Sequence, residues 1–246
     1  MIYIYYTFLR KEHVIIAFSL SRMEHMKIEG KEVTVFPAKA PEKPLVILNT
    51  VENEGKSVYE EVCQRTDMDF SMAVIGDIDW DDEMSPWMIP PLSKKAAPCT
   101  GGADRYLDTL TGRILPEIKK HLDYEPAYTA LAGYSLAGLF AVYSIYKTGA
   151  FARIASASGS FWYPDFLDFV KENEMQRIPE RIYFSLGDKE ARTRHPVLQS
   201  VEKNTTELYE YFKSKEISTI FEINPGNHFQ DNIGRMAKGI SWMIEN

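Results

Sequence analysis

The stretch LAGYSLAGLFAVY, residues 131–143, decides the fold because it places Ser135 between a short apolar run and a longer one. The first run has the length of a buried strand and the second that of a helix. A serine on a sharp strand-to-helix turn needs small residues two positions before and after it, since larger ones would collide with neighbouring backbone. Gly133 and Ala137 occupy those positions, alanine replacing the usual second glycine. The stretch favours a nucleophile elbow over a helix start that is merely rich in small residues.

Outward from this stretch, short β-type runs alternate with helical ones along most of the chain. The expected strands are residues 31–38, 44–50, 70–78, 127–133, 153–159, 181–187 and 217–224, and the expected helices are residues 56–66, 103–122, 139–146, 164–173, 195–215 and 229–245. This alternation predicts an α/β fold with a mostly parallel central sheet and helices on both faces. In such sheets, sites lie at the carboxyl ends of the strands.

Two segments depart from this rhythm. Residues 77–102 contain four prolines and no clear period, so we expect a long functional loop at the carboxyl edge of the sheet. Residues 1–22 are aromatic and apolar but charged in the middle, and we interpret them as an additional strand pair or an over-long start. No repeat or linker divides the chain, so we expect one domain over residues 1–246.

The composition is that of a globular protein, with 246 residues, of which 45% are hydrophobic and 26% charged. A net charge of −7 and the lack of a basic cluster argue against nucleic-acid and membrane partners. Cys63 and Cys99 stand far apart and outside any metal-type spacing, which favours a reducing, cytoplasmic location. Whether the chain forms a homo-oligomer is left open.

A serine nucleophile needs a histidine base, which in this chain order must follow the serine. His195 and His228 are the two histidines that do. His228 lies in a Gly/Pro/Asn loop between the last strand and the last helix, at the expected carboxyl edge. His195 precedes a proline at a helix start, where a solvated histidine is the simpler interpretation. We therefore assign the base to His228.

The acid and the oxyanion donors follow from neighbouring strand ends. Asp188 and Glu190 both come just after the strand at 181–187, and spacing alone does not separate them. The oxyanion of an acyl-transfer intermediate needs two backbone N–H groups. Leu136, next after the serine, should supply one, and the loop at Thr50 or Val51 should supply the other.

With these residues in place, the chain resembles the esterase branch of the α/β-hydrolases that contains esterase D-like, feruloyl-esterase-like and enterochelin-esterase-like enzymes. LAGYSLAGLFA, YFSLGDKEAR and NPGNHF carry the resemblance, in that order, over residues 131–229. The resemblance implies an α/β-hydrolase fold. It also implies an acid three residues after the glycine that ends its strand, which favours Glu190 over Asp188.

The expected activity is that of a serine carboxylesterase acting on small or aromatic acyl esters, without metal or cofactor. Trp162 and Trp87 are candidates for the substrate pocket. A rival within the enzyme class is a siderophore trilactone esterase, whose anionic substrate would need cations such as Lys94, Lys95, Arg192 and Arg194. A rival outside it is a non-catalytic binding protein of the same fold, although such proteins usually lose the serine or the histidine.

Overall fold

An eight-stranded sheet forms the centre of the molecule, in the strand order β1-β2-β4-β3-β7-β8-β9-β10. The structure is a computed structural model and describes residues 23–51 and 54–245, so the interpretation of residues 1–22 falls outside it. The strands are β1 Glu24–Ile28, β2 Lys31–Phe36, β3 Leu45–Asn49, β4 Ser71–Ile75, β7 Thr129–Tyr134, β8 Arg153–Ala157, β9 Arg181–Gly187 and β10 Ser218–Asn224. β1, β2 and β4 pair antiparallel, whereas β4, β3 and β7 to β10 pair parallel. The predicted, mostly parallel sheet is confirmed.

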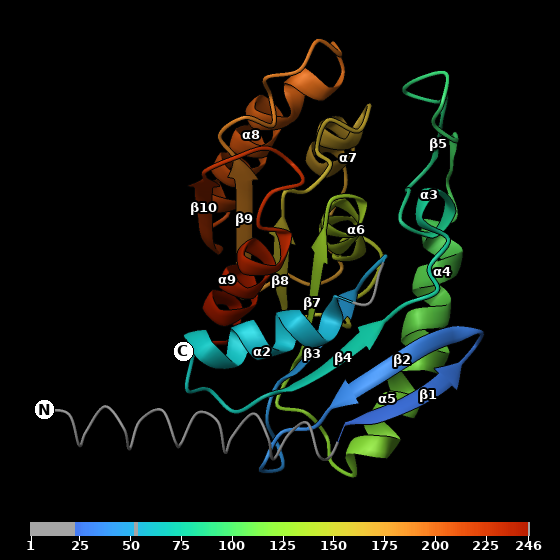
Figure 1. The fold of residues 1–246 in the computed structure, drawn as a ribbon, viewed down its shortest axis with the longest axis vertical. Helices are drawn as coiled ribbons and strands as arrows, with labels where there is room; N and C mark the ends of the chain where they lie inside the picture. Colours follow the sequence, from blue (N-terminus) through green and yellow to red (C-terminus); the bar gives the residue numbers. More distant parts are fainter. Residues whose placement is uncertain (1–22, 52–53, 246) are drawn as a thin grey trace, which may run out of the picture.

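Helices cover both faces of this sheet (Figure 1), as predicted. They are α2 Gly55–Arg65, α3 Trp80–Glu83, α4 Ala103–Thr109, the π-helical turn η1 Leu110–Ile114, α5 Leu115–Leu122, α6 Leu136–Ser144, α7 Phe166–Glu172, the 3-10 turn η2 Leu198–Ser200, α8 Val201–Ser214 and α9 Asn232–Ile244. α2 and α9 pack together on one face, and on the other face the hydrophobic cluster joins strand residues to helical residues that come mainly from α4 to α8. β3 and β4 are buried along their whole length, as the continuous apolar runs indicate.

The predicted helix over 103–122 contains one irregular turn. Pro116 in the first turn of α5 has no N–H, and its ring would clash with the carbonyl of Gly112, four residues earlier. Gly112 lies within η1, where the wider π-helical turn accommodates both effects. The helix therefore continues past the proline.

Residues 77–102 are more ordered than a long loop. They contain α3 and a small hairpin made of β5 Met88–Ile89 and β6 Cys99–Thr100. The Asp82 carboxylate accepts hydrogen bonds from Thr100 and Arg105, and the Ser85 hydroxyl oxygen accepts the N–H of Gly101 at 2.9 Å. These contacts connect the hairpin to the start of α4. The sequence did not indicate the hairpin, because each of its strands is too short to show a period.

Parallel pairing aligns the carboxyl ends of β3, β7, β8, β9 and β10 along one edge of the sheet, the upper edge in Figure 1. The loops that follow these strands carry Val51, Ser135, Ser158, Glu190 and His228. This edge is where the candidate active site lies.

Candidate active site

Ser135 lies on the turn between β7 and α6, with φ 57° and ψ −123°. A non-glycine residue at positive φ is strained, and such strain persists only where the surroundings enforce it. Here the close approach of β7 and α6 does so: a Cβ added to Gly133 would lie 2.3 Å from the carbonyl carbon and oxygen of Ala137. The same Cβ would lie 2.7 Å from that of Ala137, so alanine fits at 137 because residue 133 is glycine.

We expect Gly133→Ala to lower the free energy of unfolding by ~1–3 kcal/mol, the usual effect of overpacking. The new methyl group meets backbone, which has little room to move. Gly112→Ala is the matched control, since a Cβ there meets nothing within 4 Å. Urea denaturation of the two variants measures the difference. Equal stability of Gly133→Ala and the unmodified protein would contradict the close packing of the turn.

His228 lies beside the serine, on the loop between β10 and α9. Its Nε2 is 3.0 Å from Ser135 Oγ, and its Nδ1 is 2.7 Å from Glu190 Oε2. A proton on Nδ1, donated to the carboxylate, leaves Nε2 free to accept the serine hydroxyl. Tyr134 donates its hydroxyl to the carbonyl of His228 at 2.7 Å, which fixes the backbone of this loop. His195 lies elsewhere and donates from Nε2 to the carbonyl of Leu92 at 2.8 Å.

Glu190, rather than Asp188, contacts the imidazole. Its other oxygen, Oε1, accepts the Ser158 hydroxyl at 2.8 Å and the N–H of Gly187 at 2.7 Å. Burial alone would raise the pKa of this carboxyl, but the hydrogen bond and charge of His228, with the bonds from Gly187 and Ser158, hold the pKa below its ordinary value. Asp188 instead accepts the N–H of Gly226 at 2.7 Å and so orders the histidine loop.

These contacts predict different effects of neutralising the two acids. Glu190→Gln keeps the shape but loses the charge that orients and stabilises the imidazolium, so we expect kcat/KM for an ester to fall by about 100- to 1000-fold. Asp188→Asn keeps an acceptor for Gly226, and we expect a change of less than about 5-fold. Steady-state kinetics of both variants tests the assignment, and the opposite ranking of the two would refute it.

The oxyanion donors differ in part from the prediction. Leu136 is the first residue of α6, where a backbone N–H has no acceptor within the helix, and it stays the candidate for the first donor. The expectation that Thr50 supplies the second donor is wrong, because its N–H already donates to the carbonyl of Ile75 at 3.0 Å. Asn49 of β3 pairs with Gly133 of β7, and Val51 stands two residues after Asn49 as Ser135 stands two residues after Gly133. Val51, 56% exposed, is the remaining candidate for the second donor.

A cavity of about 280 Å³ opens beside the serine and the histidine. It is lined by Leu92, Ser135, Ser158, Ser160, Trp162, Glu190, Leu198, Val201, His228 and Phe229. Trp162 is one of these lining residues, so it stays a candidate for the substrate pocket. Trp87 does not line it: its indole donates to the carbonyl of Pro164 and its ring packs against Phe166 and Phe169. The aromatic neighbours of α7 make Trp87 a packing residue, which corrects its assignment to the pocket.

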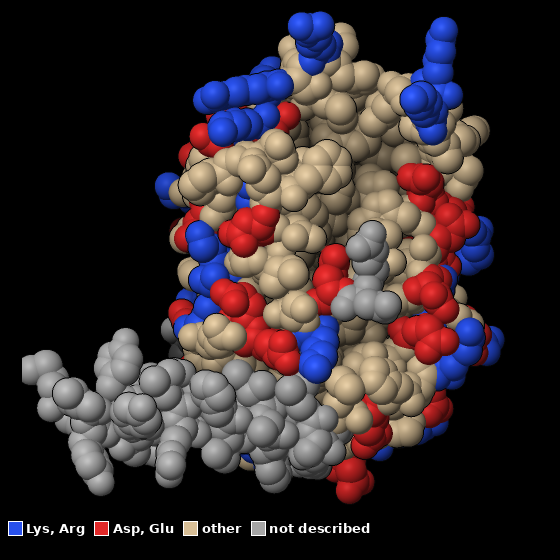
Figure 2. All heavy atoms as spheres, viewed as in Figure 1, with Lys and Arg blue, Asp and Glu red and all other residues tan. Residues whose placement is uncertain are grey.

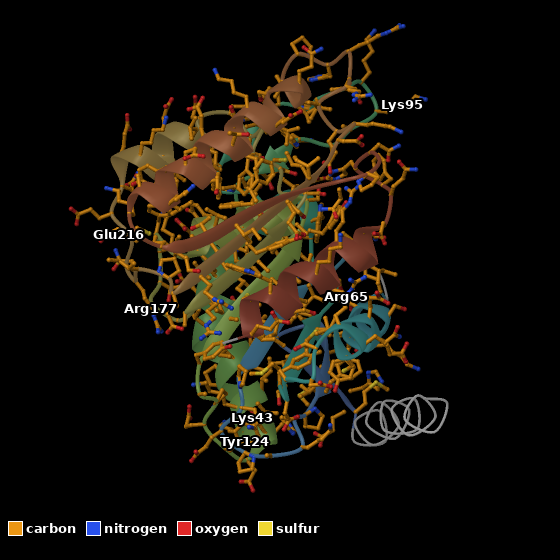
Figure 3. The ribbon with its side chains drawn as sticks, turned by 90° about the vertical axis from the view of Figure 1, so that its left-hand side faces the viewer. Lys43, Arg65, Lys95, Tyr124, Arg177 and Glu216 are labelled. Atoms are coloured by element: carbon orange, nitrogen blue, oxygen red, sulfur yellow. The ribbon has the colours of Figure 1, made fainter. Side chains whose placement is uncertain are left out.

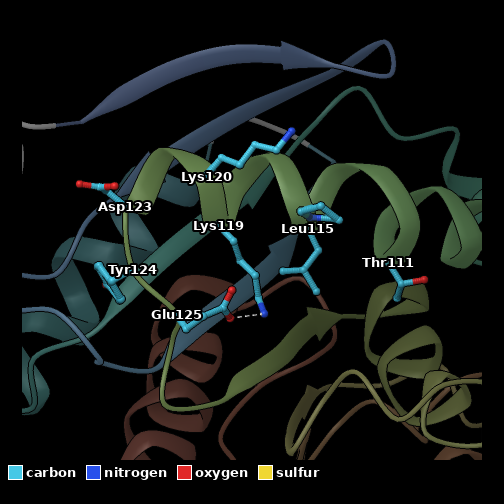
Figure 4. Close-up of a pocket in the computed structure, with 8 residues that line it drawn as sticks. Thr111, Leu115, Lys119, Lys120, Asp123, Tyr124 and Glu125 are labelled. Atoms are coloured by element: carbon cyan, nitrogen blue, oxygen red, sulfur yellow. Dashed lines mark hydrogen bonds and ion pairs between the residues drawn. The ribbon is translucent and has the colours of Figure 1, made fainter.

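A second, larger hollow of about 620 Å³ lies far from these residues, along α5 (Figure 4). Lys119 and Glu125 form an ion pair at 2.8 Å there, and the remaining lining residues provide no nucleophile next to a base. Among the described residues there is no group of three or more histidine, cysteine or acidic side chains arranged to hold a metal ion. The part of the chain covered by the structure also has no helix that is both long and apolar enough to cross a membrane.

Three residues of this site escaped the sequence interpretation: Tyr134, Ser158 and Arg235. Tyr134 comes directly after the expected strand 127–133 and Ser158 lies near the end of the expected strand 153–159, and these positions were the signal available for them. Arg235 lies on α9 and is 0% exposed, and its Nη1 is 2.9 Å from Glu190 Oε1. The signal for Arg235 was a charged residue on the apolar side of a helix.

With this geometry in place, comparison with known proteins identifies the family. The profile of the family described as Putative esterase matches residues 50–234. The chain belongs to this family. The predicted resemblance to esterases is thereby confirmed, and the protein is a member of a family of hydrolases that act on esters.

Among curated proteins, YbbA of Bacillus subtilis (strain 168) is 28% identical over 137 residues, which span 54% of this chain and 55% of YbbA. The match thus covers about half the length of that relative. Among solved structures, the siderophore hydrolase EstA from Aspergillus nidulans has a TM-score of 0.74 at 18% identity, covering 90% of this chain and 94% of EstA. An IroE-like serine hydrolase from Shewanella oneidensis has a TM-score of 0.72 at 15% identity, covering 89% and 79%. These likenesses confirm the α/β-hydrolase fold.

Proposed function

We propose that this member of the Putative esterase family is a serine carboxylesterase that cleaves small or aromatic acyl esters through an acyl-enzyme. The observation that carries the proposal is the unbroken row of contacts from Ser135 Oγ to His228 Nε2 and from His228 Nδ1 to Glu190 Oε2. Residues of three different strand ends form this row, beside a cavity and at the edge where α/β sheets hold their sites. Neither a buried core nor a binding surface needs that arrangement.

In the first half of the reaction, Ser135 Oγ attacks the ester carbonyl carbon while His228 Nε2 takes the hydroxyl proton. The carbonyl oxygen becomes an oxyanion, which accepts the N–H of Leu136 and that of Val51. The resulting imidazolium is stabilised by the Glu190 carboxylate. Collapse of the intermediate breaks the bond to the alcohol oxygen, which leaves with the proton from His228 and gives the acyl-enzyme.

In the second half, water replaces the alcohol. His228 Nε2 takes one proton from the water as its oxygen attacks the acyl carbon of Ser135. The second intermediate collapses, and the serine oxygen regains the proton from His228 while the carboxylic acid departs. Each atom and proton returns to its starting place on the protein, so the cycle needs no metal and no cofactor.

The cavity sets the size and character of the acyl group. Its volume lies near the lower end of the range for small-molecule sites, and apolar side chains dominate its lining. Trp162 and Phe229 offer ring faces, and Phe229 is 87% exposed at the mouth. An aromatic or short aliphatic acyl group matches these surroundings better than a long fatty chain does.

A siderophore trilactone esterase is the second candidate, favoured by the charges near the cavity. Lysine and arginine side chains gather at the upper end of the molecule, on both sides of a hollow (Figure 2), and Lys95 lies at this end (Figure 3). Lys94 and Lys95 come just after Leu92, and Arg192 and Arg194 precede Leu198. Leu92 and Leu198 both line the cavity. An anionic catechol substrate would be attracted there.

One substrate series separates these candidates. We suggest measuring kcat/KM for p-nitrophenyl esters of increasing acyl length beside feruloyl esters and a catechol trilactone, at low and high salt. The carboxylesterase proposal predicts the highest values for short or feruloyl esters, with little salt dependence. A trilactone that reacts fastest, and more slowly as salt rises, favours the second candidate. A protein inactive on every ester and unreactive toward a fluorophosphonate would be a binding protein.

A further inference from the structure

Arg235 is a buried cation at the start of α9, beside the loop that carries His228. It lies in the first turn of α9, which packs against β8 and β9 (Figure 1), and its side chain is 0% exposed. Arginine is almost never fully buried unless it is paired, because removing its charge from water is costly. The contacts of the guanidinium therefore decide why an arginine occupies this position.

The guanidinium reaches the loops of four neighbouring strands. Nη1 is 2.9 Å from Glu190 Oε1, 3.1 Å from the Ser158 hydroxyl and 3.3 Å from that of Tyr134, while Nη2 donates to the carbonyl of Pro225 at 3.0 Å. Tyr134 ends β7, Ser158 follows β8, Glu190 follows β9 and Pro225 follows β10. One planar cation thus ties together the elements that carry the serine, the acid and the histidine.

We propose that Arg235 is a positioning residue for the reaction: it holds Glu190 Oε1 so that Oε2 faces His228 and offsets part of the negative charge that His228 meets. This inference rests on the proposed serine esterase function. Arg235 reaches the reacting atoms only through Glu190 and the loop at Pro225, so its role is indirect. The role is assigned from the two oxygens of the Glu190 carboxylate, because Arg235 binds Oε1 and His228 binds Oε2.

The charge has a consequence for the pH dependence of the reaction. His228 contacts Glu190 through its ring and Tyr134 through its carbonyl. The segments next to its loop carry further charged groups, namely Asp188 and Lys189 after β9 and Asp231, Arg235 and Lys238 at α9. Arg235 is the cation bonded to Glu190, the acid that His228 contacts, and its charge offsets that of the carboxylate. When that charge is removed, we expect the acidic limb of the kcat/KM profile to move to higher pH.

Arg235→Met removes the charge and the hydrogen bonds but keeps much of the volume. We expect kcat at neutral pH to fall by about 10- to 100-fold, the usual loss when a supporting partner of an active group is removed. KM should change less than about 3-fold, and the acidic limb should move to higher pH. Arg235→Lys keeps the charge without the planar fork, so kcat should fall while the acidic limb stays in place.

Arg181→Met is the matched control. Arg181 also binds α9, but at its far end, through the carbonyls of Trp242 and Glu245. We expect Arg181→Met to have a lower melting temperature than the unmodified protein, with the acidic limb of its kcat/KM profile unchanged. If Arg235→Met has the kcat and pH profile of the unmodified protein, or if Arg181→Met moves the limb equally, the inference is wrong. Should Arg235→Met fail to fold, Arg235→Lys carries the test, and wild-type kcat in that variant overturns the positioning role.

The outcome also separates this inference from the proposed function. An unmodified protein that neither hydrolyses esters nor reacts with a fluorophosphonate refutes the function itself. An unmodified protein whose activity depends on Ser135, together with a fully active Arg235→Met variant, refutes only the role of Arg235.

Discussion

Ser135→Ala should lower kcat/KM for the best ester by about 10⁴-fold or more, the scale found when a serine nucleophile is removed. Alanine keeps a Cβ at the strained position, so the turn itself should persist. The variant lacks only the oxygen that would attack the carbonyl and that lies 3.0 Å from His228 Nε2. Steady-state kinetics with enzyme at high concentration, beside a thermal melt, measures the loss and checks the fold.

Ser160→Ala is the control for this prediction. Its hydroxyl is buried and lies 3.2 Å from Ser135 Oγ, so the variant removes an adjacent oxygen of the same type. We expect less than about a 10-fold change, because a single neutral hydrogen bond contributes about 1 kcal/mol. A Ser135→Ala variant that kept its activity, or a larger loss for Ser160→Ala, would move the nucleophile to another residue.

His228→Ala should produce the second large loss, about 10⁴-fold in kcat, since a serine without its base is a poor nucleophile at neutral pH. The acidic limb of the pH profile should also disappear, and activity should rise with hydroxide concentration. KM should change little, because the imidazole borders the cavity without filling it. Measuring kcat and KM from pH 5 to about pH 10 tests all three expectations.

His195→Ala provides the control for the base. His195 is the other histidine that follows Ser135 in the chain, and its contact is with the carbonyl of Leu92. Because Leu92 lines the cavity, we expect this variant to change KM or the preferred acyl group, with kcat within about 3-fold. Full activity in His228→Ala would refute the assignment of His228 as the base.

The sequence was informative wherever a local pattern reports a local structure. The buried strands β3 and β4 appear as apolar runs, and the elbow appears as small residues at fixed positions around the serine. His228 could be placed because its Gly/Pro/Asn loop follows the last expected strand, and such a loop begins at the carboxyl edge of the sheet. The order of serine, acid and histidine then restricted the partners to a few residues.

What the sequence did not predict depends on contacts between distant segments. Thr50 follows a strand as an oxyanion donor should, yet its N–H is used by Ile75 on a neighbouring strand. Trp87 is an aromatic residue near the site in sequence terms, but α7 supplies the rings that bury it. The position of Arg235 on the apolar side of α9 indicates burial, but its partner Glu190 comes from a distant segment. Pairwise contacts of this kind leave no period or spacing in the chain.

The most direct test of the account is the location of a covalent fluorophosphonate adduct, found by peptide mass spectrometry after limited labelling. The account predicts one adduct per chain, on Ser135, formed faster than on denatured protein and strongly slowed in His228→Ala. Labelling that is absent, that lies on Ser160, or that is equally fast without His228 would contradict the claim that the imidazole activates Ser135.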